Sequence, residues 1–262
     1  MKSIERQQVL MAKAKKANFV SIPDVAAELG VSVETIRRDI NILCAQNQLK
    51  KVHGGAVPMK VALYKDAVFP QRLRQNRHMK LAVAKEACKL IRDGDIVSFD
   101  GGATTVALVE ALENKHNMTF AVNSLYVAEV LVRKLREGTL SGRILLIGGE
   151  VSLNTLGAMD SYAIEALDKF HFDISFISCS SLSASGVCNS SLSGIYCKHL
   201  VSRSTTAVLI LDSSKLGNTS TYEFAKPTDF SHIIVDDQAP VPLDLLQVLE
   251  NSDTKLTVVH CD

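Results

Sequence analysis

The sequence lacks any apolar run long enough to cross a membrane. Its longest such runs, for example residues 207–211, have the length of a buried strand, whereas a spanning helix needs roughly 18 or more apolar residues. Residues 1–6 are polar and charged, so they do not form the apolar core of a secretory signal. We therefore expect a cytoplasmic protein without membrane contacts.

Patterns typical of metal sites and of disulfide frameworks are also missing. The six cysteines include no Cys-x-x-Cys pair and no His/Cys spacing of a metal site. In a cytoplasmic protein we expect these thiols to be reduced and packed as small apolar side chains. We expect neither a metal nor a cofactor.

Net charge is small but unevenly distributed. Of the 262 residues, 47% are hydrophobic and 22% charged, which is typical of a globular chain long enough for two domains. Residues 1–60 contain ten Lys/Arg and five Asp/Glu, whereas the remainder contains 19 basic and 23 acidic residues. A basic head on an acidic body indicates a polyanion-binding module joined to a second domain.

The first sixty residues predict three short helices. Residues 3–16 carry apolar side chains on a polar background and form the first. Ser21 is placed to cap the second, which ends at Gly30 in a left-handed C-cap. Ser32 caps the third, over residues 33–47, whose apolar side chains recur on one face.

A helix, a tight turn and a second helix are typical of a helix-turn-helix. The inward face of the third helix is apolar, and its outward face offers the donors that a recognition helix needs for phosphates and base edges in the major groove. Without further context, these outward side chains are equally well explained as an ordinary solvated face. The candidate DNA-binding residues here are Ser32, Thr35, Arg37, Arg38 and Asn41.

The segment after the third helix supplies that context. Residues 48–57 mix apolar and basic side chains around a Gly-Gly pair, which predicts two strands joined by a tight turn. In such a wing, Lys50, Lys51, His53 and Gly54 would lie near the phosphate backbone and supply affinity rather than sequence choice.

Residues 32–40 read SVETIRRDI and residues 49–56 read LKKVHGGA. Together they resemble the DeoR-type winged helix, in which a Ser-x-x-Thr-Ile-Arg-Arg-Asp-Leu recognition helix precedes a His-Gly-Gly-Ala wing. The resemblance implies a transcriptional regulator, a repressor in particular, with double-stranded operator DNA as its partner. It assigns residues 1–57 to the DNA-binding domain.

Residues 58–70 have no sustained period and a proline at each end, so they predict a linker. A single helix is expected from Gln71 to Ile91. Within it, Arg72 and Lys80 are either contacts for a bound anion or ordinary surface residues.

From residue 95 onward, apolar strand segments alternate with helical patterns, which predicts an α/β domain with a largely parallel sheet over residues 71–262. Several strand segments end in small, hydroxylated or acidic residues. Ligands in open α/β sheets bind at these carboxyl ends, and a Gly/Thr loop that opens a helix suits phosphate. Such glycine-rich turns also occur for packing reasons alone.

This second part resembles the DeoR-family sensor domain, which is related in fold to ribose-5-phosphate isomerase and coenzyme A transferases. The resemblance extends over residues 1–237 and implies a phosphorylated sugar or polyol as effector. The family motifs correspond here to Asp100, Gly102, Thr104, Thr105, Asn123, Ser124, Gly148, Gly149, Lys198, Asp212 and Lys215.

Four positions depart from the family pattern. Gly194 stands where the family commonly has a Glu, four residues before Lys198, while Ser178 and Ser181 replace glycines and Ala103 replaces a threonine. Because the missing carboxylate belongs to the sugar-facing part of the site, the effector is expected to differ from the usual ones or to have been lost.

The leading hypothesis is a repressor of a carbohydrate-metabolism operon that forms dimers or tetramers and is released by a sugar phosphate. One alternative is a sugar-phosphate isomerase-like enzyme with a nucleic-acid-binding appendage, for which Asp100, Asp212 and Asp236 are bases by type. Gly194 argues against that chemistry. A further alternative is a constitutive DNA-binding protein with a vestigial sensor.

Overall fold

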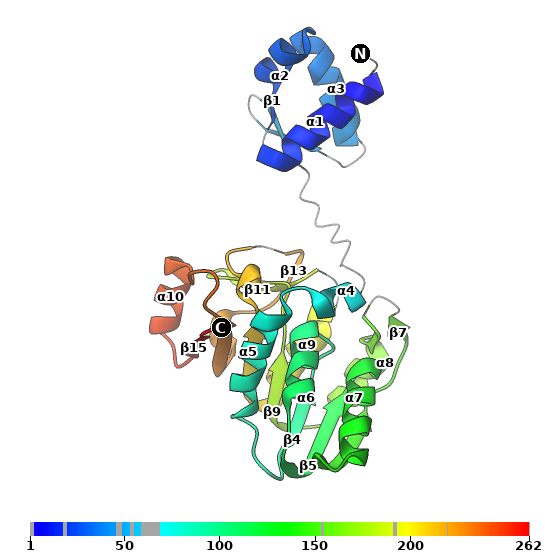
Figure 1. Cartoon of the computed structure of the whole chain (residues 1–262), viewed down its shortest axis with the longest axis vertical. Helices are drawn as coiled ribbons and strands as arrows, with labels where there is room; N and C mark the ends of the chain where they lie inside the picture. The colour runs from blue at the N-terminus through cyan, green and yellow to red at the C-terminus, as the bar shows by residue number, and fades with distance from the viewer. Residues whose placement is uncertain are drawn as a thin grey trace. The chain divides into compact units, whose positions relative to one another are not determined.

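The computed structural model describes residues 3–17, 20–45, 49–52, 55–58, 69–152, 155–190, 193–218 and 220–261 (Figure 1). The chain divides into two compact units, Met1–Lys65 and Asp66–Asp262. Among the described residues, no helix has both the length and the apolar character needed to cross a membrane.

The N-terminal unit contains the three predicted helices and the predicted wing. Its elements are α1 (Ser3–Ala17), β1 (Val20–Ser21), α2 (Ile22–Leu29), α3 (Val33–Ala45), β2 (Leu49–Val52) and β3 (Gly55–Pro58).

The helix ends follow the predicted capping residues. The Ser21 hydroxyl accepts a hydrogen bond from the Asp24 amide, and Gly30 ends α2 in the left-handed region with φ 63°. At the start of α3, the Ser32 hydroxyl accepts a bond of 3.2 Å from the Thr35 amide. These local bonds define the helix-turn-helix.

The wing is one strand larger than the sequence predicted. Strands β2 and β3 pair antiparallel, with Val52 opposite Gly55, and the two-residue β1 pairs with the other side of β3. A segment of two residues between helices is too short to show a strand period. The unit has its own core, made of Leu10, Ala14, Val20, Val25, Ala26, Ile36, Ile40, Leu43, Leu49 and Ala56.

The C-terminal unit is built on a seven-stranded sheet in which all paired neighbours are parallel, in the order β15-β14-β12-β9-β4-β5-β6. The strands are β4 (Ile96–Phe99), β5 (Lys115–Val122), β6 (Leu140–Leu146), β9 (Phe172–Ile177), β12 (Ser204–Leu211), β14 (His232–Asp236) and β15 (Lys255–Val259). Strand segments that the sequence predicts at residues 96–100, 120–122, 144–147, 174–177, 207–211 and 233–235 correspond to the first six of these strands, whereas β15 was not predicted.

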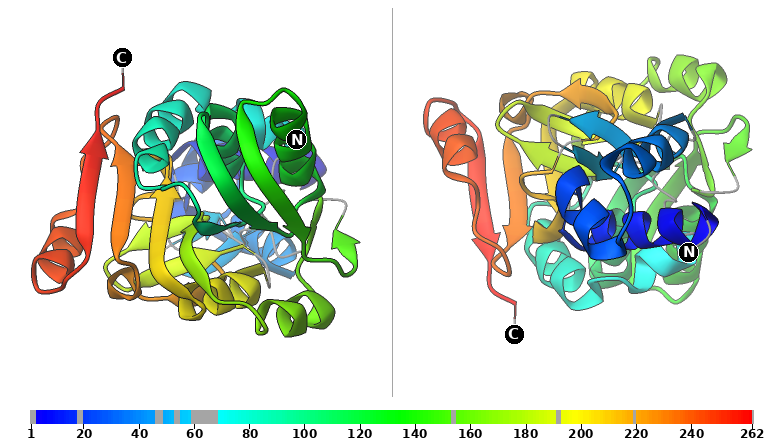
Figure 2. Two further views of the ribbon diagram at one scale, coloured as in Figure 1. Left: turned by 90° about the horizontal axis from the view of Figure 1, so that it is seen from below. Right: turned by 90° about the horizontal axis from the view of Figure 1, so that it is seen from above.

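Helices cover both faces of this sheet, as Figure 2 shows. One face packs against α5 (Arg77–Cys88), α6 (Ala103–Ala111) and α7 (Leu125–Arg136), and the other against α8 (Ser161–Leu167), α9 (Ser193–Ser202) and α10 (Leu243–Glu250). Alternate residues of each strand enter the two cores: Phe99, Phe120 and Phe176 pack on the first face, and Ala121, Ile177 and Leu209 on the second. The predicted α/β architecture is confirmed.

Shorter elements complete the unit. A second sheet has the order β10-β11-β13, and β7 pairs with β8. These strands, which the sequence analysis did not predict, are β7 (Val151–Ser152), β8 (Gly157–Ala158), β10 (Ser181–Ser183), β11 (Gly186–Asn189) and β13 (Tyr222–Ala225). Two 3-10 turns cover Ser213–Lys215 and Pro227–Asp229.

The single helix predicted from Gln71 to Ile91 is wrong. The structure has α4 (Phe69–Arg74) and α5, separated at Asn76, whose φ of 52° lies in the left-handed region. Asparagine tolerates this conformation better than most residues. Helix α4 therefore begins inside the segment predicted as a linker, of which residues 59–68 lie outside the described residues.

Candidate functional site

The outward face of α3 carries the predicted base-reading side chains. Arg38, Asn41 and Ser32 are exposed, and 59% of the Arg37 side chain is accessible to solvent. Thr35 is half-buried, and its hydroxyl forms a 2.8 Å hydrogen bond with that of Ser32. The opposite face, with Ile36 and Ile40, is fully buried. The helix therefore presents a polar, cationic surface on the side opposite its packed apolar face.

Asp39, on the buried side of α3, links this helix to α1. It is 2% exposed, and its carboxylate accepts hydrogen bonds from Ser3 (2.6 Å), Arg6 (2.7 Å) and Gln7 (3.2 Å). Burial opposes ionisation of this carboxyl, but the hydrogen bonds and the Arg6 charge outweigh burial and lower its pKa. This partly buried ion pair is not evident from the sequence, because its members lie 33 positions apart.

The described residues include only part of the wing. The backbones of Lys50 and Lys51 lie in β2, opposite Val57 and Ala56 of β3. His53 and Gly54 lie outside the described residues. The roles of these four residues at the DNA backbone stay predictions.

In the C-terminal unit, Asp100 joins the carboxyl ends of β4 and β9. One carboxylate oxygen accepts hydrogen bonds from the Gly102 amide (2.9 Å) and from the Thr105 hydroxyl. The other accepts from the amide and the hydroxyl of Ser178, both at 2.8 Å. Both oxygens are thus engaged within the protein, and Asp100 shapes the Gly/Thr loop.

Asp236 repeats this arrangement two strands away. It is the last residue of β14, is fully buried, and accepts from the amide (2.8 Å) and hydroxyl (2.7 Å) of Ser213, which follows β12. In each case, a carboxylate at one strand end holds a serine that follows a neighbouring strand. The strand ends are therefore set by internal hydrogen bonds.

Gly102 and the threonines form the start of α6. The first intrahelical bond runs from the Val106 amide to the Gly102 carbonyl at 3.0 Å, so the amides of residues 103–105 precede the helical ladder. Thr104 is 5% exposed and Thr105 fully buried. The Thr105 hydroxyl is used by Asp100, and a helix start with these amides and the Thr104 hydroxyl is suited to an anion.

Asp212 and Lys215 follow β12, where the Asn76 side chain reaches Asp212. The Asn76 side chain donates to Asp212 at 3.0 Å and to Ser214 at 3.2 Å. Lys80 lies 3.9 Å from Asp212, and both side chains are almost fully buried. Sequence reasoning missed Asn76, although an asparagine in a polar turn is typical of the left-handed conformation.

These strand ends converge on one another. Burial raises the pKa of the Cys179 thiol, which is reached by the charges of Lys215, Asp100 and Asp212. On the other side, a methyl group at Gly101 would lie 3.4 Å from Ser124 Cβ. We call this group the strand-end cluster: Asp100, Gly101, Gly102, Thr104, Thr105, Asn123, Ser124, Ser178, Asp212 and Lys215.

Asn123 and Ser124 end β5 and begin α7. The Ser124 hydroxyl caps α7 by accepting from the Val127 amide. The Asn123 side chain donates to the Ala158 carbonyl at 2.9 Å, while its oxygen is buried without a hydrogen-bond partner among the described residues. That oxygen is a buried hydrogen-bond acceptor that the described residues leave unused.

Among the described residues, the remaining predicted effector residues form no hydrogen bond or ion pair with this cluster. Gly148 and Gly149 are exposed, and a side chain at Gly149 would lie 2.3 Å from Asp160 Oδ1 at the start of α8. Lys198 is exposed on α9. Their roles in effector binding stay predictions.

The space beside Gly194 is apolar. This glycine is buried in α9, and a Cβ there would lie 3.1 Å from Phe224 Cβ. Any side chain at this position would therefore require Phe224 to shift by a few tenths of an ångström. Nearby in the chain, the Tyr196 hydroxyl is buried without a partner among the described residues, and burial raises its pKa well above the usual range.

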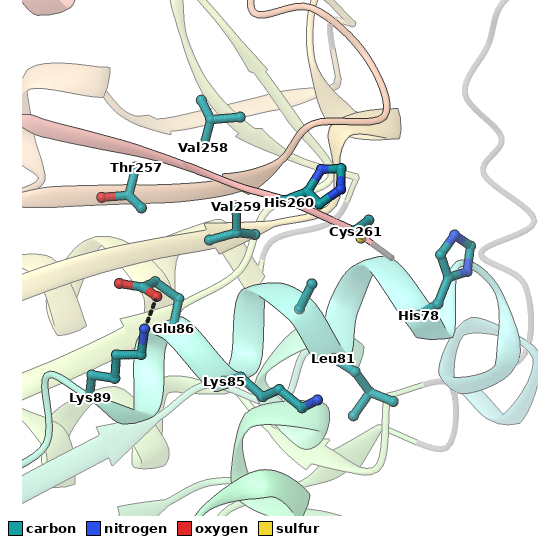
Figure 3. Close-up of a pocket in the computed structure, with 11 residues that line it drawn as sticks. His78, Leu81, Lys85, Glu86, Lys89, Thr257, Val258, Val259, His260 and Cys261 are labelled. Carbon is teal, nitrogen blue, oxygen red and sulfur yellow. Dashed lines mark hydrogen bonds and ion pairs between the residues drawn. The ribbon is translucent and has the colours of Figure 1, made fainter.

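A separate groove lies between α5 and β15 (Figure 3). It has a volume of about 600 Å³ and is lined on one side by Leu81 and Lys85 and on the other by Val259 and His260. Figure 3 shows Val259 pointing toward α5 and Val258 pointing away. None of the predicted effector residues lines this groove.

Architecture and helix ends define a winged helix joined to a three-layer α/β unit. Residues 6–61 match the family model for a DeoR-like helix-turn-helix domain, and residues 75–237 match that for a DeoR C-terminal sensor domain. The chain belongs to the DeoR family of helix-turn-helix transcriptional regulators.

Two relatives that align with this chain over most of their length are named as transcriptional regulators or repressors. A lactose phosphotransferase system repressor of Staphylococcus aureus is 30% identical over 237 residues, covering 90% of this chain and 93% of that protein. The HTH-type transcriptional regulator GolR of Listeria innocua is 28% identical over 236 residues, covering 89% and 91%.

Among solved structures, a D-ribose-5-phosphate isomerase in complex with phospho-erythronic acid is 16% identical, with a TM-score of 0.40 over 53% of this chain and 54% of that one. Likeness at this level does not define an activity.

Proposed function

We propose that the chain is a sequence-specific repressor that binds operator DNA through α3 and the wing, and that a phosphorylated sugar or polyol releases it. The single observation that supports DNA binding is the outward face of α3, where Arg37, Arg38 and Asn41 are exposed while the opposite face of the helix is apolar and buried. Half-sites on DNA are separated by whole helical turns, so a homo-oligomer with two winged helices is expected to bind them.

Two variants distinguish base reading from backbone contact. Arg38→Ala should weaken binding to a selected operator sequence by roughly 1–3 kcal/mol while leaving non-specific binding nearly unchanged. Lys51→Ala should weaken binding to all sequences alike and reduce the slope of log affinity against log salt by about 1. Fluorescence anisotropy with selected and scrambled duplexes measures both, and unchanged affinity in both variants would refute the placement of the winged helix on DNA.

The effector part of the proposal is supported by the start of α6. Its amides and the hydroxyl of Thr104 offer donors for phosphate, and the unpartnered oxygen of Asn123 offers an acceptor for a sugar hydroxyl. Binding there would shift the population toward arrangements in which two winged helices no longer match two half-sites. A panel of sugar and polyol phosphates should therefore include one that lowers operator affinity.

A regulatory rather than enzymatic role is supported by the names of the relatives and by the carboxylates. An isomerase needs a carboxylate or other base that can take a substrate proton. Asp100 and Asp236 instead accept hydrogen bonds from serine amides and hydroxyls. We expect no isomerisation of ribose 5-phosphate above background, which a coupled assay of the full chain tests.

A further inference from the structure

Glu34 lies on the outward face of α3, among the polar and cationic side chains that are predicted to contact DNA. Its side chain is 69% exposed. Arg38 and Asn41, which follow it by four and seven residues, are also exposed, while the opposite face of the helix is buried. Side chains at this spacing lie on one face of an α-helix. Glu34 therefore forms one stripe with Arg38 and Asn41 along the surface that α3 presents to solvent.

The fold of the N-terminal unit makes little use of the Glu34 carboxylate. Among the described residues, its one polar partner is Arg37, whose Nη1 lies 3.5 Å from Oε2. Charge-assisted hydrogen bonds are typically about 2.7–2.9 Å long, and an ion pair between two exposed side chains contributes little to stability. Asp39, the other acid of α3, is buried and bound to α1. Glu34 is thus the exposed acid of this helix, with capacity to accept further hydrogen bonds.

A carboxylate at this position opposes DNA binding in general. Duplex DNA carries one negative charge per roughly 1.7 Å of its axis, so the affinity of a protein for any sequence comes from its cations. The Glu34 carboxylate is repelled by these phosphates whatever the sequence. Only a site that offers hydrogen-bond donors to the carboxylate can offset this repulsion, which makes the acid a means of discrimination between sequences.

Cytosine is the base whose major-groove edge matches a group that accepts hydrogen bonds and cannot donate them. Its N4 amino group is a donor, whereas guanine presents two acceptors, thymine an acceptor and a methyl group, and adenine an acceptor beside its donor. The residues at the start of a recognition helix are those that contact base edges. Glu34 lies in the first turn of α3.

We propose that Glu34 is a base-reading residue that accepts a hydrogen bond from the N4 amino group of a cytosine in each operator half-site, and that its charge weakens binding to sequences without this cytosine. This inference rests on the proposed function, because it names a base pair that the first turn of α3 recognises. Arg37 and Arg38 raise the affinity for any duplex, and Glu34 lowers it wherever the cytosine is missing.

The first experiment measures binding of the full chain to two duplexes by fluorescence anisotropy: an operator that the wild type selects from random sequences, and a scrambled version. Glu34→Gln removes the charge with little change in size. It should bind the scrambled duplex more tightly, because a repulsion is lost. The ratio of operator affinity to scrambled affinity should fall roughly 5- to 100-fold. Any loss of folded protein cancels in this ratio.

Glu28→Gln is the matched control. Glu28 is an exposed acid of α2, paired with Lys13 at 2.6 Å, and its side chain is 54% accessible. The same chemical change there alters the net charge equally but lies outside the stripe on α3. It should change both affinities by the same factor and leave their ratio unchanged.

The second experiment identifies the base. Each cytosine of the selected operator is replaced in turn by pyrimidin-2-one, which lacks the N4 amino group and leaves the guanine of the pair intact. At one position the wild type should lose roughly 5- to 100-fold more affinity than Glu34→Ala does, which is the coupling between the carboxylate and the amino group. Glu34→Asp, which is one methylene shorter, should lose this coupling but keep the weak binding of the wild type to the scrambled duplex.

The outcomes distinguish this inference from the proposed function. If Glu34→Gln leaves the ratio unchanged, the inference is refuted while DNA binding through α3 stands. If the ratio falls but no cytosine is coupled to Glu34, the carboxylate acts by positioning Arg37, and the contact with cytosine is refuted. If the wild type selects no sequence from the random duplexes, the inference fails together with the proposed sequence-specific repressor.

Discussion

Gly102 and Ser178 occupy one corner of the strand-end cluster. A Cβ at Gly102 would lie 1.8 Å from Ser178 Oγ and 2.8 Å from Ser178 Cβ. Ser178 cannot move away freely, because its amide and hydroxyl are bound to Asp100. The serine that departs from the family pattern is therefore accommodated by the glycine opposite it.

Gly102→Ala should destabilise the C-terminal unit by about 1–3 kcal/mol, because a methyl group is forced into an occupied space. Ser178→Gly should cost less stability in the Gly102→Ala protein than in the wild type, because in both it removes the hydrogen bond of the hydroxyl to Asp100 but only in the former does it remove the colliding atoms. Gly101→Ala is the control, since its Cβ would meet Ser124 at an ordinary 3.4 Å. Denaturant unfolding gives the free energies, and a Gly102→Ala protein as stable as Gly101→Ala would contradict this packing.

At this scale the sequence revealed residue types but not their partners. The motif placed Asp100, Thr105 and Lys215 near a ligand, and the structure gathers Asp100, Thr105 and Lys215 at the strand ends. It did not reveal that Asp100 is engaged by Ser178, 78 positions away. Nor did it identify Asn76, whose contact with Asp212 spans 136 positions. Such pairings depend on the order of strands in the sheet.

Among the elements, helices with capping signals were predicted best. Ser21, Gly30 and Ser32 act within a few residues of their own helices, so their effect is readable from local sequence. The break between α4 and α5 was missed because nothing in the local polar pattern requires it. It is stabilised from outside, by the bonds of Asn76 to Asp212 and Ser214.

The link between α1 and α3 depends on ionised Asp39. Its pKa is lower in the folded than in the unfolded protein, so this stabilisation is complete above the unfolded value near ~3.9 and is lost as pH falls through the folded value. Asp39→Asn should cost about 1.5–3 kcal/mol at pH 7, because hydrogen bonds to a charged acceptor are weakened.

The difference in unfolding free energy between the wild type and Asp39→Asn should shrink as the pH is lowered toward 3. Glu34→Gln is the matched control: its carboxylate is 69% exposed and lies in the same helix, so its loss should change stability by less than about 0.5 kcal/mol. A difference for Asp39→Asn that does not vary with pH would mean that its charge is not what stabilises the helix pair.

For the whole molecule, the alternation of strands and helices predicted a parallel α/β unit, and a parallel sheet follows from crossover helices. That alternation does not predict the order of the strands within the sheet, because β4 pairs with β9 and β9 with β12 across long stretches of chain. The small sheet β10-β11-β13 and the edge strand β15 were missed for the same reason. Strand β10 pairs with the adjacent β11, but β11 pairs with β13 across α9 and β12, and β15 pairs with β14 across α10.

The two units have separate hydrophobic cores. Every buried residue of the N-terminal core lies between Leu10 and Ala56, and the two cores of the C-terminal unit begin at Phe69. A unit of about 65 residues buries a smaller fraction of its surface than a larger one and is less stable for it. Calorimetry of the full chain should therefore show two transitions, with the N-terminal unit unfolding first.

Ligands should move these transitions separately. A ligand that binds only the native form of one unit stabilises that unit by about 2.7 kcal/mol at a concentration of 100 Kd. Operator DNA should raise the first transition and an effector phosphate the second. Asp39→Asn should lower only the first, and Gly102→Ala only the second, which assigns each peak independently of ligand. A single transition that all four changes shift together would show instead that the two units unfold as one cooperative body.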